Sequence, residues 1–112
     1  MIEVSKGLFG NNIKYRLHVI FNDEFKNDID IYILENHWNK SNIVNDLIRL
    51  KYSQDRVEAI INNHFLNIAD WLNAKFKGEE VEFSDPDYEE LQAWRKECKA
   101  IANDALAIYP EY

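Results

Sequence analysis

The first third of the chain alternates apolar and polar residues, as half-buried β-strands do. Apolar side chains occupy every second position from Ile13 to Phe21, within a segment spanning 12–21, and again from Ile29 to Ile33. Residues 2–5 form a shorter candidate strand, and the turn-prone Gly10-Asn11-Asn12 follows it. We expect the two longer strands to pair antiparallel through a connection at 22–27, which is rich in Asp and Asn.

The polar positions of these two strands carry opposite charges. In the antiparallel register Lys14, Arg16 and His18 share a face with Asp28 and Asp30. Opposite charges on neighbouring strands stabilise a sheet by about 0.2–1 kcal/mol per pair. The charge pattern therefore supports a β-hairpin.

After residue 40 the apolar spacing becomes three and four residues, the period of a helix. A first helix is expected from an N-cap at Ser41 or Asn42 to Lys51, followed by a break at Tyr52 and Ser53. A last helix begins with Asp85 as N-cap and Pro86 at the first helical position. Its apolar stripe consists of Tyr88, Leu91, Trp94, Cys98, Ile101, Ala102, Ala105 and Tyr109.

Between these two lies a long helix, which starts at the N-cap Ser53 and ends at Gly78. Asparagines at 62, 63 and 67 are weak helix formers and allow a break near Asn67. The stripe keeps its phase past them, which favours one helix over two across 54–77. The stripe consists of Val57, Ile60, Ile61, His64, Phe65, Ile68, Trp71, Leu72 and Phe76.

Strands followed by helices indicate an α+β fold: a small antiparallel sheet packed against about three helices, in one domain spanning 1–112. We expect the helix stripes to cover the apolar face of the sheet. On this prediction Ile61, Phe65 and Trp71 of the long helix are buried against the sheet and the last helix. Replacing a buried Phe65 by Ala would then cost about 3–5 kcal/mol.

Composition narrows the class of protein. The chain is 46% hydrophobic and 13% aromatic, too apolar for a disordered protein. Its single cysteine excludes an intramolecular disulfide framework. We see neither a signal peptide after Met1 nor an apolar run of about 20 residues that could cross a bilayer. The expected location is the cytoplasm, with no membrane partner.

Charge narrows the class of partner. The formal net charge is −7, and residues 66–112 hold most of it, with eleven acids against five bases. A negative surface repels phosphates, so direct nucleic-acid binding is not expected. The run from Glu79 to Glu90 holds seven acids and no base, and helix capping accounts for four of them. We predict that Glu79, Glu80 and Glu82 meet a protein partner with a basic surface.

Candidate catalytic and metal-binding residues do not form a recognisable set. The three histidines and Cys98 show no metal-ligand spacing, and the three glycines form no phosphate-binding loop. His64 lies on an apolar stripe, where a hydrogen-bonded core or interface residue is expected. Cys98 is expected to act as a small apolar residue. We therefore expect no cofactor, no metal and no enzymatic activity, and a small enzyme with an unrecognised site is the second alternative.

Two features point to protein contacts. Trp38 lies in the polar stretch Asn36-His37-Trp38-Asn39, where it is either an exposed interface anchor or a lid over the sheet edge. Leu66, Phe76 and Ile108 fall at or beyond the stripe edges, which leaves more apolar surface than one small sheet can cover. A symmetric homodimer would bury this surplus.

Residues 52–63 (YSQDRVEAIINN) and 87–96 (DYEELQAWRK) resemble stretches of small proteins encoded by bacteriophages and mobile elements of gut bacteria. The resemblance covers the C-terminal half of the chain and implies a phage or prophage origin, without a mechanism. The expected function is a non-enzymatic protein-protein interaction protein. The first alternative is a structural or accessory component of a virion.

Overall fold

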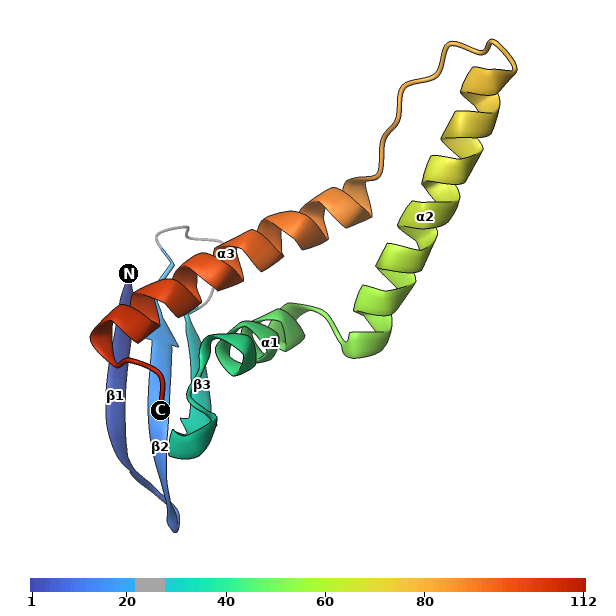
Figure 1. Ribbon diagram of the computed structural model, residues 1–112. Coiled ribbons are helices and arrows are strands. Elements are labelled where there is room, and N and C mark those ends of the chain that lie inside the picture. Colours follow the sequence, from blue (N-terminus) through green and yellow to red (C-terminus); the bar gives the residue numbers. More distant parts are fainter. Residues whose placement is uncertain (22–27) are drawn as a thin grey trace.

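A computed structural model describes residues 1–21 and 28–112. Strands β1 (Ile2–Phe9), β2 (Asn12–Val19) and β3 (Ile29–Leu34) form one antiparallel sheet in the order β1-β2-β3 (Figure 1). The predicted pairing of the two longer strands is confirmed. The predicted connection at 22–27 lies outside the described residues.

Opposite charges meet across β2 and β3 as predicted. Arg16 Nη2 lies 2.8 Å from Asp30 Oδ1. The His18 ring approaches two carboxylates, with Nδ1 2.7 Å from Asp30 and Nε2 3.6 Å from Asp28. This face of the sheet is polar, so the opposite face must carry the core.

The first strand is longer than the sequence pattern predicts. It continues through Gly7 to Phe9, which pairs with Asn12 across a two-residue turn. Gly10 opens that turn at φ +64°, a conformation that glycine adopts without strain. Apolar and polar residues alternate only weakly in this segment, because β1 lies at the edge of the sheet. Hydrogen bonding to β2, rather than burial of side chains, extends the strand to Phe9.

Three α-helices follow the short 3-10 helix Glu35–His37: α1 (Lys40–Lys51), α2 (Gln54–Phe76) and α3 (Pro86–Ile108). The predicted N-caps Ser53 and Asp85 are confirmed, and α2 is one continuous helix. The predicted cap of α1 is wrong. Its N-cap is Asn39, whose side-chain oxygen accepts a 2.9 Å hydrogen bond from the Asn42 amide and so starts the helix earlier.

The core lies between the apolar face of the sheet and the helices α1 and α3, both of which pack on that face (Figure 1). The sheet contributes Tyr15, Leu17, Val19, Ile31 and Ile33. The helices contribute Ile43 and Leu47 from α1, and Trp94, Cys98, Ile101, Ala102 and Ala105 from α3. The α+β fold class is thus confirmed.

Helix α2 is arranged differently from the prediction, because it projects away from the sheet (Figure 1). Ile60 is the buried residue of this helix, and Phe65, predicted to be in the core, is 65% exposed. That prediction is wrong, since α1 and α3 already fill the sheet face. We call the sheet, α1 and residues 94–112 the head, and residues 54–93 the arm.

The projecting arm makes the molecule elongated. Its extents are 62 × 29 × 22 Å and its radius of gyration is 18.4 Å. A compact domain of this length has a radius of gyration of about 13 Å. Much of the arm's surface is therefore not covered by the rest of the chain.

The head core can be tested with two leucines of α1. Leu47 is fully buried, whereas Leu50 is half exposed. We expect Leu47→Ala to lower the free energy of unfolding by about 2–5 kcal/mol, because it leaves a cavity. Leu50→Ala is the matched control and should cost well under half as much. Equal losses in urea unfolding would contradict this description of the core.

Candidate protein-binding surface

The arm consists of α2, the first turns of α3 and a segment that runs back along α2. Gly78 (φ +82°) ends α2 and reverses the chain, and residues 79–85 return toward the start of α3 (Figure 1). The Trp71 indole Nε1 donates a 3.0 Å hydrogen bond to the Val81 carbonyl oxygen. The Phe83 ring meets Trp71 edge-on, with 5.8 Å between centroids. These contacts hold the returning segment on one side of α2.

Asp85 joins α2 to α3 at the base of this segment. Its carboxylate accepts hydrogen bonds from His64 Nδ1 (2.9 Å) and Asn67 Nδ2 (3.1 Å) of α2, and caps α3 through the Tyr88 amide (3.4 Å). The His64 ring stacks on Tyr88, with 3.5 Å between centroids. We call Asp85, His64, Asn67 and Tyr88 the clasp.

The clasp stabilises the ionised form of Asp85, although the side chain is only 8% exposed. The hydrogen bond from His64 is the main cause that lowers the pKa of Asp85, and the Asn67 amide and the Tyr88 backbone N–H act in the same direction. Since an ionised carboxylate only accepts hydrogen bonds, His64 Nδ1 is the donor. The expected hydrogen-bonded role of His64 is confirmed.

The two sides of α2 differ in what covers them. Asn67, Asp70, Trp71 and Ala74 face the returning segment and line with it a hollow of about 340 Å³. Helix geometry, at 100° per residue, places a second set of residues on the opposite side. This set, the bare stripe, consists of Phe65, Ala69, Leu72 and Phe76, all of them exposed. Phe76 is 96% exposed.

The predicted partner-binding carboxylates lie on the returning segment. Glu79, Glu80 and Glu82 are exposed, and no described residue forms an ion pair with them. Two apolar side chains of the same segment, Val81 and Phe83, are more than one-third exposed. We call residues 79–83 the acidic segment. Whether it binds a partner stays a prediction.

Trp38 is not an exposed anchor. It is completely buried, and its ring stacks on Tyr15 with 4.4 Å between centroids. Its indole Nε1 donates a 2.7 Å hydrogen bond to the Tyr109 carbonyl, and its own carbonyl accepts one from the Tyr112 amide. The chain after α3 therefore closes over Trp38, which sequence alone could not show because the two parts are 71 residues apart.

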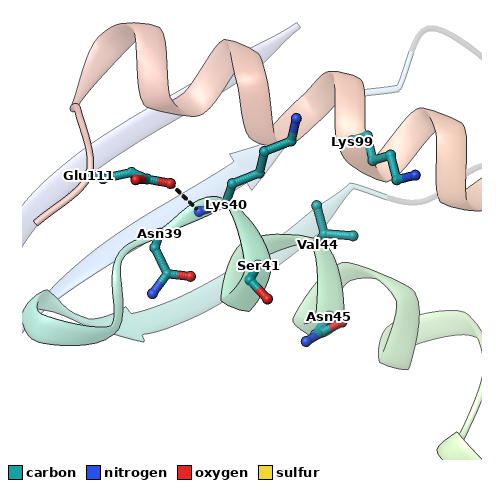
Figure 2. Close-up of a pocket in the computed structure, with 7 residues that line it drawn as sticks. All are labelled: Asn39, Lys40, Ser41, Val44, Asn45, Lys99 and Glu111. Carbon is teal, nitrogen blue, oxygen red and sulfur yellow. Dashed lines mark hydrogen bonds between the residues drawn. The ribbon is translucent and has the colours of Figure 1, made fainter.

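The head carries a shallow hollow, of about 590 Å³, at the N-terminus of α1. Figure 2 shows Glu111 reaching into it, where its carboxylate accepts a 2.9 Å hydrogen bond from the Lys40 amide. The lining residues are Asn39, Lys40, Ser41, Val44, Asn45, Lys99 and Glu111. No described residue forms a hydrogen bond with the hydroxyl of Ser41, so the lining holds no nucleophile paired with a base.

The cysteine and the possible metal ligands of the sequence do not form a reactive site among the described residues. Cys98 is buried in the core, and burial is the main cause that raises the pKa of its thiol to about 12. Among residues 1–21 and 28–112, no three His, Cys, Asp or Glu side chains are grouped so that they could hold a metal ion. None of the helices in the same residues is long and apolar enough to span a membrane.

Comparisons of the chain with protein-family models, curated proteins and solved structures give no match.

The clasp predicts a pH-dependent effect of Asp85→Asn. Asparagine keeps the N-cap but removes the charge that His64 binds, so the melting temperature should fall at neutral pH. Because folding lowers the pKa of Asp85, its charge stabilises the fold above the unfolded pKa, about 3.9, and this contribution is lost as pH falls through the folded pKa. The gap between wild type and variant should therefore be largest above pH 5 and narrow below pH 4.

The matched control is Asp87→Asn, two residues along the same helix turn. Asp87 is exposed and makes a 3.7 Å ion pair with Arg56, which is also exposed. We expect this variant to change the melting temperature little at any pH. Thermal unfolding followed by circular dichroism between pH 3 and 7 measures both variants. If the melting temperature of both variants depends on pH in the same way, the clasp makes no specific contribution to stability.

Proposed function

We propose that this is a non-enzymatic protein-interaction protein that binds its partner through the arm. One observation carries the proposal: six exposed large apolar side chains lie within residues 65–83 of the arm, whereas those exposed on the head, such as Leu8, Tyr32 and Ile108, belong to separate elements. Soluble monomers rarely leave a large continuous apolar patch in water, and such patches mark protein interfaces. The exposed residues of the arm are Phe65, Leu66, Leu72, Phe76, Val81 and Phe83.

The charge of the arm supports a partner with a basic surface. Three exposed carboxylates lie beside the apolar side chains Val81 and Phe83 in the acidic segment. A mixed apolar and acidic strip suits a protein surface that offers lysine or arginine beside an apolar patch. The net charge of −7 supports a protein partner over a nucleic acid.

A photo-crosslinking experiment tests the binding role and captures the partner, whatever its identity. A photoreactive amino acid replaces Val81, and light is applied in the cells that make the protein. We expect one or a few discrete covalent adducts. The same substitution at Asn103, exposed on the head part of α3, is the control and should give none. An absence of discrete adducts at position 81 would overturn the proposed function.

A partner identified in this way allows the charge to be tested. Changing Glu79, Glu80 and Glu82 together to Gln should slow association severalfold at low ionic strength and little at high salt, because salt screens exposed charges. The control removes three acidic charges from the head, at Glu3, Asp46 and Asp104. Stopped-flow association rates compare the two triple variants. Equal association rates for the two triple variants would show that the acidic segment faces solvent and has no role in association.

A further inference from the structure

The bare stripe has the spacing of a surface that packs against another helix. Its residues are separated by four, three and four positions, and the half-buried Ile61 and Ile68 extend the pattern along its margin. Apolar residues spaced by three and four form the contact line of paired helices. From Ile61 to Phe76 this line is about 22 Å long. The returning segment lies on the other side of α2 and leaves this line uncovered.

The surface area of the chain exceeds what a compact monomer exposes. The accessible area is 7805 Å². A compact monomer of 13.3 kDa exposes about 6,500 Å², so about 1,300 Å² is additional. A standard interface buries about 800 Å² on each partner. The additional surface is therefore large enough for one complete dimer interface.

We infer that the bare stripe binds the same stripe of a second copy of this chain, with the two α2 helices antiparallel about a two-fold axis beside Ala69. The inference deepens the proposed function, since it rests on the arm as a protein-binding surface and names the occupant of one side. A two-fold interface must be self-complementary, because the same residues contribute from both copies. The order of side chains along the stripe meets that requirement.

With the axis between positions 68 and 69, each large side chain lies opposite another apolar residue. Phe65 of one copy faces Leu72 of the second, and Ile61 faces Phe76. Ile68 faces Ala69 near the axis, where the small alanine lets the two helices approach closely. Both exposed phenylalanines of α2 would be covered in this arrangement.

Charge favours the antiparallel direction. The first half of α2 is net negative, with Asp55 and Glu58 against Arg56, whereas its second half and C-cap are net positive, with Lys75 and Lys77 against Asp70. Antiparallel pairing brings the acidic end of each helix beside the basic end of the other, and it also opposes the two helix dipoles. Parallel pairing would place like charges together. The acidic segment stays accessible, because it lies on the other side of α2.

The test compares two leucines of the same helix. Leu72 belongs to the bare stripe and is 53% exposed, whereas Leu66 is 64% exposed and lies about 100° away from Phe65. Light scattering from micromolar to millimolar concentration should show wild type reaching twice the monomer mass of 13.3 kDa. Leu72→Glu should weaken dimerisation about 100-fold or more, since each dimer then buries two charges. Leu66→Glu should retain the dimer, and circular dichroism should show that both variants keep their helices.

Cysteine pairs test the direction. Ala69→Cys should form a disulfide between copies on oxidation, because position 69 lies beside the axis. Phe76→Cys should not, since the two positions would be about 22 Å apart and a disulfide needs Cα atoms within about 7 Å. The native Cys98 is buried and does not compete. Efficient crosslinking at both positions would indicate parallel helices and overturn the antiparallel arrangement.

A strict monomer at millimolar concentration, or a dimer equally sensitive to Leu66→Glu and Leu72→Glu, would overturn the inference. Neither result affects the proposed function if position 81 still crosslinks to a different protein. The opposite result is also possible: the dimer behaves as predicted, but position 81 crosslinks to no protein other than a second copy of this chain. Self-association would then be the only protein contact found for the arm. Failure of the dimer inference and failure of the proposed function therefore give different experimental results.

Discussion

The width of the sheet sets the arrangement of everything that follows it. Three strands at about 4.8 Å spacing make a sheet about 14 Å wide, and a helix with its side chains is about 10 Å across, so two helices leave no room for a third on the same face. Helices α1 and α3 occupy that face and bury its apolar residues. A third amphipathic helix has no sheet left to cover. Helix α2 projects from the head instead, and its Phe65, Leu66, Leu72 and Phe76 stay exposed.

The clasp determines how α2 projects. Asp85 is both the N-cap of α3 and the acceptor of two side-chain hydrogen bonds from the middle of α2. The Asp85 carboxylate therefore joins α3, which extends from the head into the arm, to α2, which carries the bare stripe. Near the clasp, Ile60 and Leu91 are buried but do not belong to the head core. The arm thus has a small apolar contact of its own.

Local signals predict most of this fold from the sequence. Alternating residues identify β2 and β3, complementary charges give their register, and Ser53, Gly78, Asp85 and Pro86 mark helix ends. What the sequence does not contain is the partner of each apolar face. The stripe of α2 looks the same in the sequence whether it covers a sheet or stays exposed, which is why the prediction for Phe65 fails. The sequence leaves Trp38 ambiguous for a similar reason, since residues near the other end of the chain cover it.

The candidate surface can be predicted only in part. Exposed acids at Glu79, Glu80 and Glu82 follow from a run without bases, and surplus apolar residues such as Leu66 and Phe76 point to an interface. The role of Asp85 beyond capping cannot be predicted, because His64 lies 21 residues away and meets it only after the chain reverses at Gly78. A glycine at that place marks a helix end but not the direction of the chain beyond it.

The division of the buried residues into a head cluster and a small arm contact has a consequence for how the chain opens. Most of the free energy of burial lies in the head, so amide hydrogens of α2 exchange through a local opening that leaves the sheet intact. Within α3 we expect the boundary between fast and slow exchange near Trp94, whose indole donates a hydrogen bond to the Leu47 carbonyl. One continuous helix is therefore expected to belong to two cooperative units, its first two turns opening with the arm while the rest stays with the sheet.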